Sequence, residues 1–194
     1  MEASDYERLQ KNEILKDCLP SLVNNFNAQG TLEIQYDKPA VNVHMGNELL
    51  PSDTQTLPVI TYHASKPLDL EATYTIIMTD PDVPSRLDNS EGEVCHYVAT
   101  GFKFDSVKGG VLSGQGVARR PYIGPAPAKN TALHRYVFML LKEPKGKTEF
   151  TEIKSIFCWG YGEAGTGIDR WSKENDLEVL AINFFLAENE ENDK

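Results

Sequence analysis

YTIIMTDPDVPSR, residues 74–86, joins a strong strand signal to a concentration of charge. Its first part, Tyr74 to Met78, is apolar and rich in β-branched residues, a pattern that predicts a buried strand. Two carboxylates, two prolines and an arginine follow at once, so a rigid element delivers them together. Because proline and aspartate are ordinary turn residues, this segment is either a polar turn or one wall of a ligand pocket.

A second stretch, GPAPAKNTALHRYVFMLL at residues 124–141, has a matching composition. Glycine and prolines lead to His134 and Arg135, and the apolar run 137–141 predicts another strand. The first stretch is itself followed by a histidine, His96. Proline, histidine and arginine therefore accompany two separate strands, which favours the pocket over the turn.

Composition limits the class of protein. The chain has 194 residues, enough for one domain with a real core. Its formal net charge of −10 argues against nucleic-acid binding, which needs a basic surface, and disfavours general adhesion to anionic membranes. No stretch is typical of a signal peptide or a membrane span, so we expect no integral membrane association. Three widely spaced cysteines form neither a disulfide framework nor a zinc pattern, and they favour a cytoplasmic protein.

Much of the remaining chain carries strand patterns. Residues 31–36 alternate apolar and polar side chains, as a half-exposed strand does. Further short runs typical of strands lie at 59–62, 97–99, 102–104 and 177–186. Many strands with few helices imply an all-β sandwich or barrel rather than alternating strands and helices.

The two ends of the chain and one long segment stand apart from these strands. Residues 4–19 predict one or two short helices, and 168–174 predict another. The segment 109–129 is rich in glycine and proline and predicts a long loop. We expect residues 1–187 to form a single domain and the acidic tail, 188–194, to be disordered.

Two other kinds of site can be assembled from the same residues. His96, His134 and the nearby carboxylates could hold a metal, but nothing in their spacing is a metal signature. A hydrolase needs a nucleophile beside a base, and Ser85 and Cys95 are the nearby candidates. Cys95 and His96 are adjacent on a predicted strand, so their side chains point to opposite faces. We therefore expect no metal, no catalytic residue and no enzymatic activity.

The same polar residues suit a small anion. An aspartate beside a histidine fixes the imidazole tautomer and favours its charged form. A histidinium and the backbone N–H groups of a proline-rich turn can bind a phosphate oxygen. The aspartate would repel the anion unless the histidines carry charge. The pattern therefore predicts tighter anion binding at mildly acidic pH.

Taken together, the two stretches resemble a known family. DPDVPSR with the downstream Glu93 and His96, followed by GPAPAKNTALHRYVF, is similar to the paired signature of the phosphatidylethanolamine-binding protein family. Segments 159–162 and 175–185 are most similar to its fungal branch, which contains the carboxypeptidase Y inhibitor. The resemblance covers nearly the whole chain, from about residue 14 to about residue 188. It implies a mostly β fold, in which a large antiparallel sheet packs on a smaller one with short peripheral helices.

The resemblance also implies roles for individual residues. It places the anion pocket at Asp80, Pro84, His96, Ala126, Pro127, His134 and Tyr136. It gives structural roles in the same motifs to Asp82, Arg86 and Glu93. The family's cis peptide corresponds to the bond between Val83 and Pro84. Two positions depart from the family pattern: Val94 replaces a frequent aromatic residue, and Ala126 replaces a frequent glycine. Both changes can weaken or narrow the pocket.

The implied function is that of a regulator without a cofactor. Its expected partners are a serine carboxypeptidase or a signalling protein, and a phosphate or phospholipid head group. In the fungal branch the N-terminal segment matters for inhibition, and here it corresponds to Met1, Glu2, Ala3, Ser4, Asp5 and Tyr6. The alternative is a phosphate- or phospholipid-binding protein in signalling that inhibits no protease, because a shared fold does not carry function with it.

Overall fold

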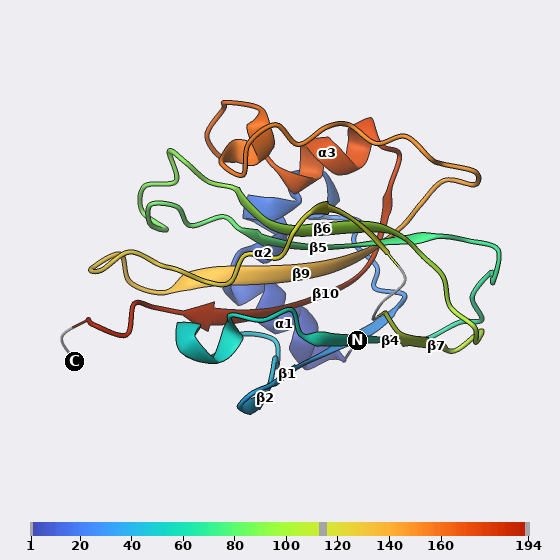
Figure 1. The fold of residues 1–194 in the computed structure, drawn as a ribbon, viewed down its shortest axis with the longest axis horizontal. Helices are drawn as coiled ribbons and strands as arrows, with labels where there is room; N and C mark the ends of the chain where they lie inside the picture. Colours follow the sequence, from blue (N-terminus) through green and yellow to red (C-terminus); the bar gives the residue numbers. More distant parts are fainter. Residues whose placement is uncertain (1, 113–115, 193–194) are drawn as a thin grey trace.

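The computed structural model describes residues 2–112 and 116–192, which form two packed β-sheets (Figure 1). The small sheet contains, in spatial order, β2 (Ala40–Asn42), β1 (Gly30–Asp37), β4 (Val59–Ala64) and β7 (Gly109–Val111). The large sheet contains β3 (Asn47–Glu48), β10 (Glu178–Ala187), β9 (His134–Lys142), β5 (Tyr74–Asp80), β6 (Val94–Phe102) and β8 (Val117–Arg120). Neighbouring strands are antiparallel except β3 and β10, which are parallel. This mostly β, two-sheet architecture confirms the predicted fold class.

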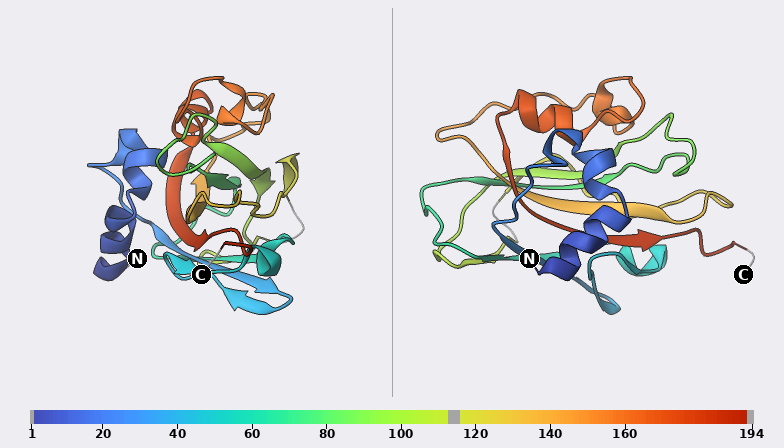
Figure 2. Two further views of the ribbon diagram at one scale, coloured as in Figure 1. Left: turned by 90° about the vertical axis from the view of Figure 1, so that its left-hand side faces the viewer. Right: turned by 180° about the vertical axis from the view of Figure 1, so that it is seen from behind.

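Helices cover the outer face of the large sheet (Figure 2). They are α1 (Ala3–Lys11), α2 (Ile14–Cys18) and α3 (Ile168–Glu174). Short 3-10 turns lie in the connecting segments: η1 (Pro20–Leu22), η2 (Pro51–Thr54) and η3 (Cys158–Gly160). The helix predicted at 168–174 is present, and the helical segment predicted before Pro20 consists of α1 and α2. Within the described residues, no helix combines the length and apolar character needed to cross a membrane.

The two central strands, β5 and β9, are buried on both faces. Their inner face packs against the small sheet in a core that includes Tyr36, Tyr62 and Phe138. Their outer face packs against the helices in a second core, which contains Trp159 and Trp171. A strand that is covered on both sides has no polar face to present. This explains why both strands are continuous apolar runs in the sequence rather than alternating patterns.

Two expectations about the elements were wrong in detail. The segment 109–129 is not one long loop, because β7 and β8 lie within it at the edges of the two sheets. The strands predicted at 97–99 and 102–104 are a single strand, β6, which ends at Phe102. β7 and β8 have only three and four residues, and two of those in β7 are glycines, so pairing with the neighbouring strand decides their structure.

The tail beyond β10 contacts the loop that precedes β9. The Asn189 side chain donates to the Pro127 carbonyl at 2.9 Å, and the Asn130 amide donates to Asn192 Oδ1 at 2.9 Å. The acidic composition of the tail does not predict these contacts, because asparagine side chains make them. Asp193 and Lys194, like Met1, lie outside the described residues.

Both motif stretches lie at one end of the large sheet. β5 and β9 are antiparallel and Thr79 is opposite Val137, so the end of β5 is beside the beginning of β9. The loop after β5 and the loop before β9 therefore emerge side by side, at the left of Figure 1 and at the right of the rear view in Figure 2. The topology brings together two motifs that are about fifty residues apart in the sequence.

Candidate anion-binding site

Asp80 links the two motif loops. It ends β5 and is 1% exposed. One carboxylate oxygen accepts the Asp82 amide at 2.7 Å, which closes the turn after the strand. The other oxygen lies 2.9 Å from Nδ1 of His134, at the beginning of β9. The carboxylate thus shapes its own loop and orients a ring on the other wall.

Asp82 and Arg135 form the main contact between the loop after β5 and the beginning of β9. The Arg135 amide and Nε both donate to Asp82 Oδ2, at 2.8 and 2.9 Å, and Nη2 donates to Oδ1 at 2.6 Å. Both side chains are almost completely buried. The planar guanidinium matches the carboxylate in a two-pronged arrangement, which is the strongest geometry for such a pair. Asp82 therefore links the loop after β5 to the beginning of β9, at a position for which the resemblance implied a structural role.

Arg135 and Arg86 also hold the junction between α1 and α2. Arg135 Nη1 donates to the Asn12 carbonyl and to Asp17 Oδ2, each at 2.7 Å. Arg86 Nη2 donates to the same carbonyl at 3.2 Å and to Glu13 Oε2 at 3.0 Å. Sequence reasoning assigned Arg86 to the motif but missed these two partners at the junction. No local pattern connects residues that are so far apart in the chain.

A bulge in β6 directs His96 into the site. Tyr97 pairs with Met78 and Cys95 pairs with Thr79, so His96 is an extra residue without a partner on β5. The bulge leaves Cys95 in the core beneath the helices, while His96 meets the ring of Tyr136 edge-on at 5.3 Å. β-Bulges often re-aim a side chain beside a functional site. The predicted divergence of Cys95 and His96 is confirmed.

The two histidines have different partners. His134 Nδ1 faces Asp80, and its Nε2 lies 2.9 Å from the Thr131 hydroxyl, so both ring nitrogens are engaged. His96 Nδ1 donates to the Ile123 carbonyl at 2.8 Å. Within the described residues, His96 Nε2 has no hydrogen-bond partner. His96 therefore has the nitrogen that is available to an anion, whereas His134 is held in place.

Burial controls the protonation of this site. His96 is 6% exposed, and burial lowers the pKa of its imidazole below the ordinary value. Burial and the nearby Asp80 carboxylate raise the pKa of Tyr136, so its hydroxyl remains a hydrogen-bond donor. His134 stacks on Tyr136 with ring centroids 6.4 Å apart. At neutral pH the available nitrogen of His96 is an acceptor, and it becomes a donor when the ring takes up a proton.

The remaining predicted residues form the rim and the support of the site. Ala126 is exposed, Pro84 is half-buried and Pro127 is buried. Gln55 donates to the Pro125 carbonyl at 2.8 Å and so supports this loop from η2. The peptide bond between Val83 and Pro84 is cis, as the resemblance implied.

Phe157 stands beside one of the two departures from the family pattern. Val94 is buried and forms an isolated β-bridge with Phe157, whose side chain is 45% exposed. The chain thus brings an aromatic residue from a distant loop opposite the position for which the resemblance implied one. Sequence reasoning missed Phe157 because the bridge depends on tertiary pairing alone.

Glu93 supports the site from below. It is 1% exposed, and its two oxygens accept hydrogen bonds from the Thr79 hydroxyl at 2.9 Å and the Ile168 amide at 3.0 Å. Burial raises the pKa of Glu93 to about 8. This carboxyl therefore links β5 to the first turn of α3 through hydrogen bonds.

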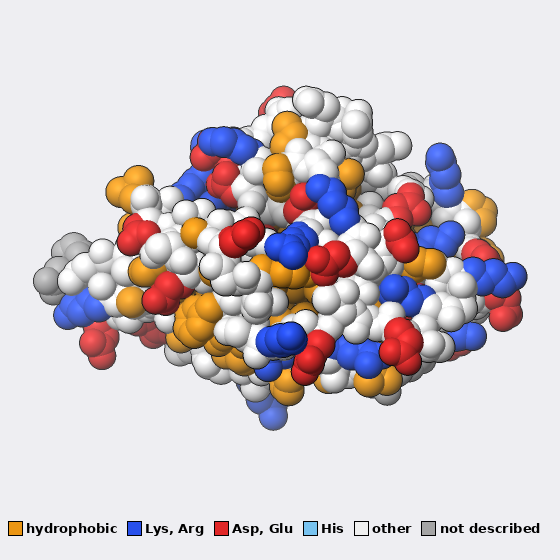
Figure 3. Space-filling view, turned by 90° about the horizontal axis from the view of Figure 1, so that it is seen from above, with side chains coloured by type: hydrophobic (Ala, Val, Ile, Leu, Met, Phe, Trp, Pro, Cys, Tyr) orange, Lys and Arg blue, Asp and Glu red, His pale blue; other side chains and the backbone are white. Residues whose placement is uncertain are grey.

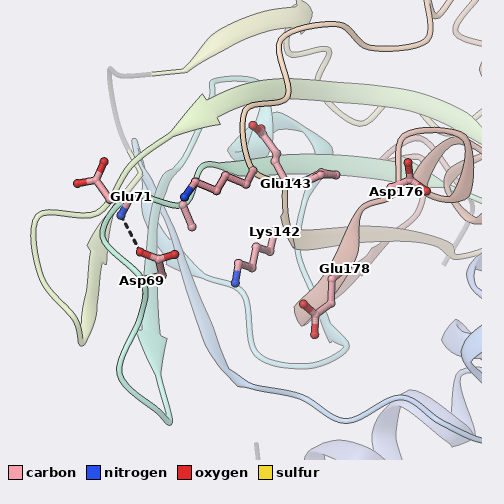
Figure 4. A pocket seen from close by; sticks show the side chains of 9 residues that line it. Asp69, Glu71, Lys142, Glu143, Asp176 and Glu178 are labelled. Carbon is pink, nitrogen blue, oxygen red and sulfur yellow. Dashed lines mark hydrogen bonds between the residues drawn. The ribbon is translucent and has the colours of Figure 1, made fainter.

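A hollow lies at the other end of the large sheet from the motif loops (Figure 4). It measures about 300 Å³ and is lined by charges of both signs. Figure 4 shows Lys142 between Asp69 and Glu178. In the part of the chain that the structure describes, no group of three or more histidines, cysteines and carboxylates could hold a metal ion. The acidic side chains around this hollow therefore do not form a metal site.

Comparisons with known proteins agree with this geometry. The family model for phosphatidylethanolamine-binding proteins matches residues 24–185. Two Saccharomyces cerevisiae proteins are similar over most of their length. An uncharacterized protein is 37% identical over 97% of this chain and 96% of its own. The carboxypeptidase Y inhibitor is 33% identical over 92% of each chain.

Solved structures show the same fold. The carboxypeptidase Y inhibitor, in a crystal structure with its cognate proteinase, has a TM-score of 0.89 and 33% identity and covers 96% of both chains. A phosphatidylethanolamine-binding protein from Plasmodium vivax has a TM-score of 0.74 and 24% identity over 95% of this chain and 97% of its own. The second likeness is one of fold alone.

The raised pKa of Glu93 predicts that the protein loses stability as the pH rises to about 8. A carboxyl that titrates near pH 8 when folded and near 4.5 when unfolded favours the folded state while it is protonated. We expect the free energy of unfolding to fall by up to roughly 5 kcal/mol between pH 4.5 and 8 and then to level off. Urea unfolding at a series of pH values measures this.

The variant Glu93→Gln is the control for this prediction. Glutamine keeps an acceptor for the Ile168 amide and cannot ionise. We expect it to lose most of the decline between pH 4.5 and 8. Parallel curves for the wild type and the variant would show that another group is responsible.

The geometry of His96 predicts stronger anion binding in acid. Sulfate is the suitable probe because its charge does not change over this range. Since burial lowers the pKa of His96, we expect sulfate affinity to rise mainly below pH 6.5, by about tenfold per unit at most. Isothermal titration calorimetry between pH 8 and pH 5 measures the affinity.

Two histidine variants complete this experiment. His96→Ala is expected to abolish the pH dependence. His63→Ala is the matched control, because His63 pairs with Glu33 on the exposed side of the small sheet. Affinity that is constant, or higher in alkali, would refute the role of His96.

Proposed function

This chain belongs to the phosphatidylethanolamine-binding protein family, and from that premise we propose that it is a regulator that inhibits a serine carboxypeptidase and holds a small anion between its motif loops. The likeness to the carboxypeptidase Y inhibitor, at 33% identity and a TM-score of 0.89, supports the protein-binding part. The phosphatidylethanolamine-binding proteins and the carboxypeptidase Y inhibitor are named for binding and inhibition, which supports a role without catalysis. The free, buried cysteines Cys18, Cys95 and Cys158 are compatible with a cytoplasmic setting.

The anchored N-terminal segment is the observation that carries this proposal. Arg86 and Arg135, from the two motif stretches, both donate hydrogen bonds to the Asn12 carbonyl, just after α1. Tyr6 stacks on Phe26 and hydrogen bonds to its carbonyl, so α1 is also tied to the body at its beginning. Glu2, Ala3 and Ser4 remain exposed beyond this anchor. A short segment presented on a rigid base loses little entropy when it binds a partner.

The predicted partner-binding residues therefore divide into two groups. Glu2, Ala3 and Ser4 are accessible to a protease, whereas Tyr6 holds the helix in place. Asp5 caps the helix: the Glu2 amide donates to its carboxylate at 3.0 Å. We assign contact with the protease to the exposed group and positioning to the other.

The anion part of the proposal rests on His96 and its surroundings. A protonated His96 would offer Nε2 to an anion, while the Tyr136 hydroxyl is engaged by Asp80. Figure 3 shows acidic and basic side chains interspersed over the face that carries α3, without a uniform basic area in this view. A local pocket, rather than the surface charge of this face, would therefore recognise the phosphate of a head group or a free phosphate.

The alternative is an anion-binding protein that inhibits no protease. The relative that is 37% identical has no assigned function, so similarity alone does not select the inhibitor. His96 contacts Tyr136, and Asp80 contacts both Tyr136 and His134, without help from the N-terminal segment. Inhibition and anion binding can consequently be tested separately.

The proposal predicts that the exposed N-terminal residues are required for inhibition. We expect the full chain to inhibit purified carboxypeptidase Y and a chain lacking residues 1–4 to lose at least most of that inhibition. Hydrolysis of a peptide substrate at increasing inhibitor concentration measures the effect. Full inhibition by the truncated chain would refute the assignment of this segment.

A matched variant separates lost contacts from a lost helix cap. Truncation removes Glu2, which forms a capping box with Asp5, so it destabilises the start of α1 by about 0.5–2 kcal/mol. The variant Asp5→Ala breaks the cap but keeps the chain length and the exposed residues Glu2, Ala3 and Ser4. We expect it to inhibit, with a lower melting temperature. Sulfate binding without inhibition in the full chain would support the alternative function.

A further inference from the structure

A cleft of about 310 Å³ separates the edges of the two sheets, away from the anion site. Pro58 and Ile60 line it from the small sheet, Ile76, Tyr97 and Phe102 line it from the large sheet, and Leu112 lies where β7 ends. None of the predicted anion-site residues lines this cleft. We propose that it binds an uncharged apolar molecule, of about one aromatic ring with a short chain, through a single oxygen acceptor.

Tyr97 supplies the polar contact of this site. Tyr97 is 7% exposed, and its hydroxyl forms no hydrogen bond with the described residues. Among those residues, Arg120 Nε is the polar side-chain atom that is fully buried without a partner, so the Tyr97 hydroxyl is accessible to solvent in the cleft that Tyr97 lines. Tyr122 meets Tyr97 edge-on at 6.0 Å, but the hydroxyl of Tyr122 is engaged by Tyr36 and the Thr54 carbonyl. An oxygen acceptor on a ligand would take the place of water at the Tyr97 hydroxyl.

The hydroxyl of Tyr97 is a donor across the ordinary pH range. Burial raises the pKa of Tyr97, so the group stays protonated. The other five residues named above are apolar, and they offer no charge to a ligand. A donor in an apolar cleft selects a ketone, ester or ether over a hydrocarbon of the same shape, and it disfavours charged molecules.

The size and rim of the cleft limit the ligand further. Small-molecule sites commonly measure about 300–1,000 Å³, and an apolar cavity of about 150 Å³ already holds benzene. The cleft is at the lower end of that range. At its margin, Leu57 is 50% exposed and Val117, which follows the lining residue Gly116, is 59% exposed. These exposed apolar side chains give a ligand a hydrophobic path into the cleft.

Two matched probes test the proposal: butyrophenone, which carries a ketone oxygen, and butylbenzene, which has the same ring and chain without it. Methyl NMR of isoleucine- and leucine-labelled protein follows Ile60, Ile76 and Leu112. We expect butyrophenone to shift these signals saturably and to bind about tenfold more tightly than butylbenzene, because a buried hydrogen bond distinguishes them.

Three variants test whether the probes bind in this cleft and whether the Tyr97 hydroxyl causes the preference for butyrophenone. Tyr97→Phe keeps the ring and should make the two probes bind equally. Ile60→Phe fills the cleft and should abolish binding of both, while His96→Ala in the anion site should change neither affinity. Absence of saturable shifts at these methyls, or equal affinity of the two probes in the wild type, would overturn the proposal. Because Tyr97→Phe leaves the core volume almost unchanged, the test does not depend on the filling variant.

Discussion

The buried pair between Asp82 and Arg135 is the contact on which the arrangement of this molecule depends. It joins the end of β5 to the beginning of β9 through three hydrogen bonds to one carboxylate. The remaining nitrogen of the guanidinium reaches Asn12 and Asp17 at the base of the N-terminal helices. Removing one partner of such a pair leaves an uncompensated buried charge, which is strongly unfavourable. The pair therefore specifies which three segments lie together.

The anion site is built on this frame from residues with separate tasks. Asp80, two residues before Asp82, orients His134, and Thr131 engages the other nitrogen of that ring. The bulge in β6 turns His96 toward Tyr136 and leaves one of its nitrogens available. His134 thus has a supporting position, and His96 is the candidate anion-binding residue. The pair between Asp82 and Arg135 also positions the N-terminal segment. The proposed protease inhibition and anion binding therefore depend on the same structural contact but use different binding residues.

The sequence could predict the two walls of the site but not their internal contacts. Runs 74–78 and 137–141 are strands buried on both faces, and continuous apolar runs are a strong signal. His96 required a bulge, whose position depends on the register between β5 and β6. Phe157 reaches Val94 through a bridge between distant segments. Such features depend on tertiary pairing, and no local pattern in the sequence encodes them.

The most direct test of this account is hydrogen–deuterium exchange of the variant Asp82→Asn. Asparagine has the same shape but loses the charge and one acceptor that Arg135 requires. If the pair holds three segments together, amides of the loop 83–92 and of the junction 12–18 will exchange faster together, while those of β10 will not change. Faster exchange in the loop alone, with the junction as protected as in the wild type, would contradict the account.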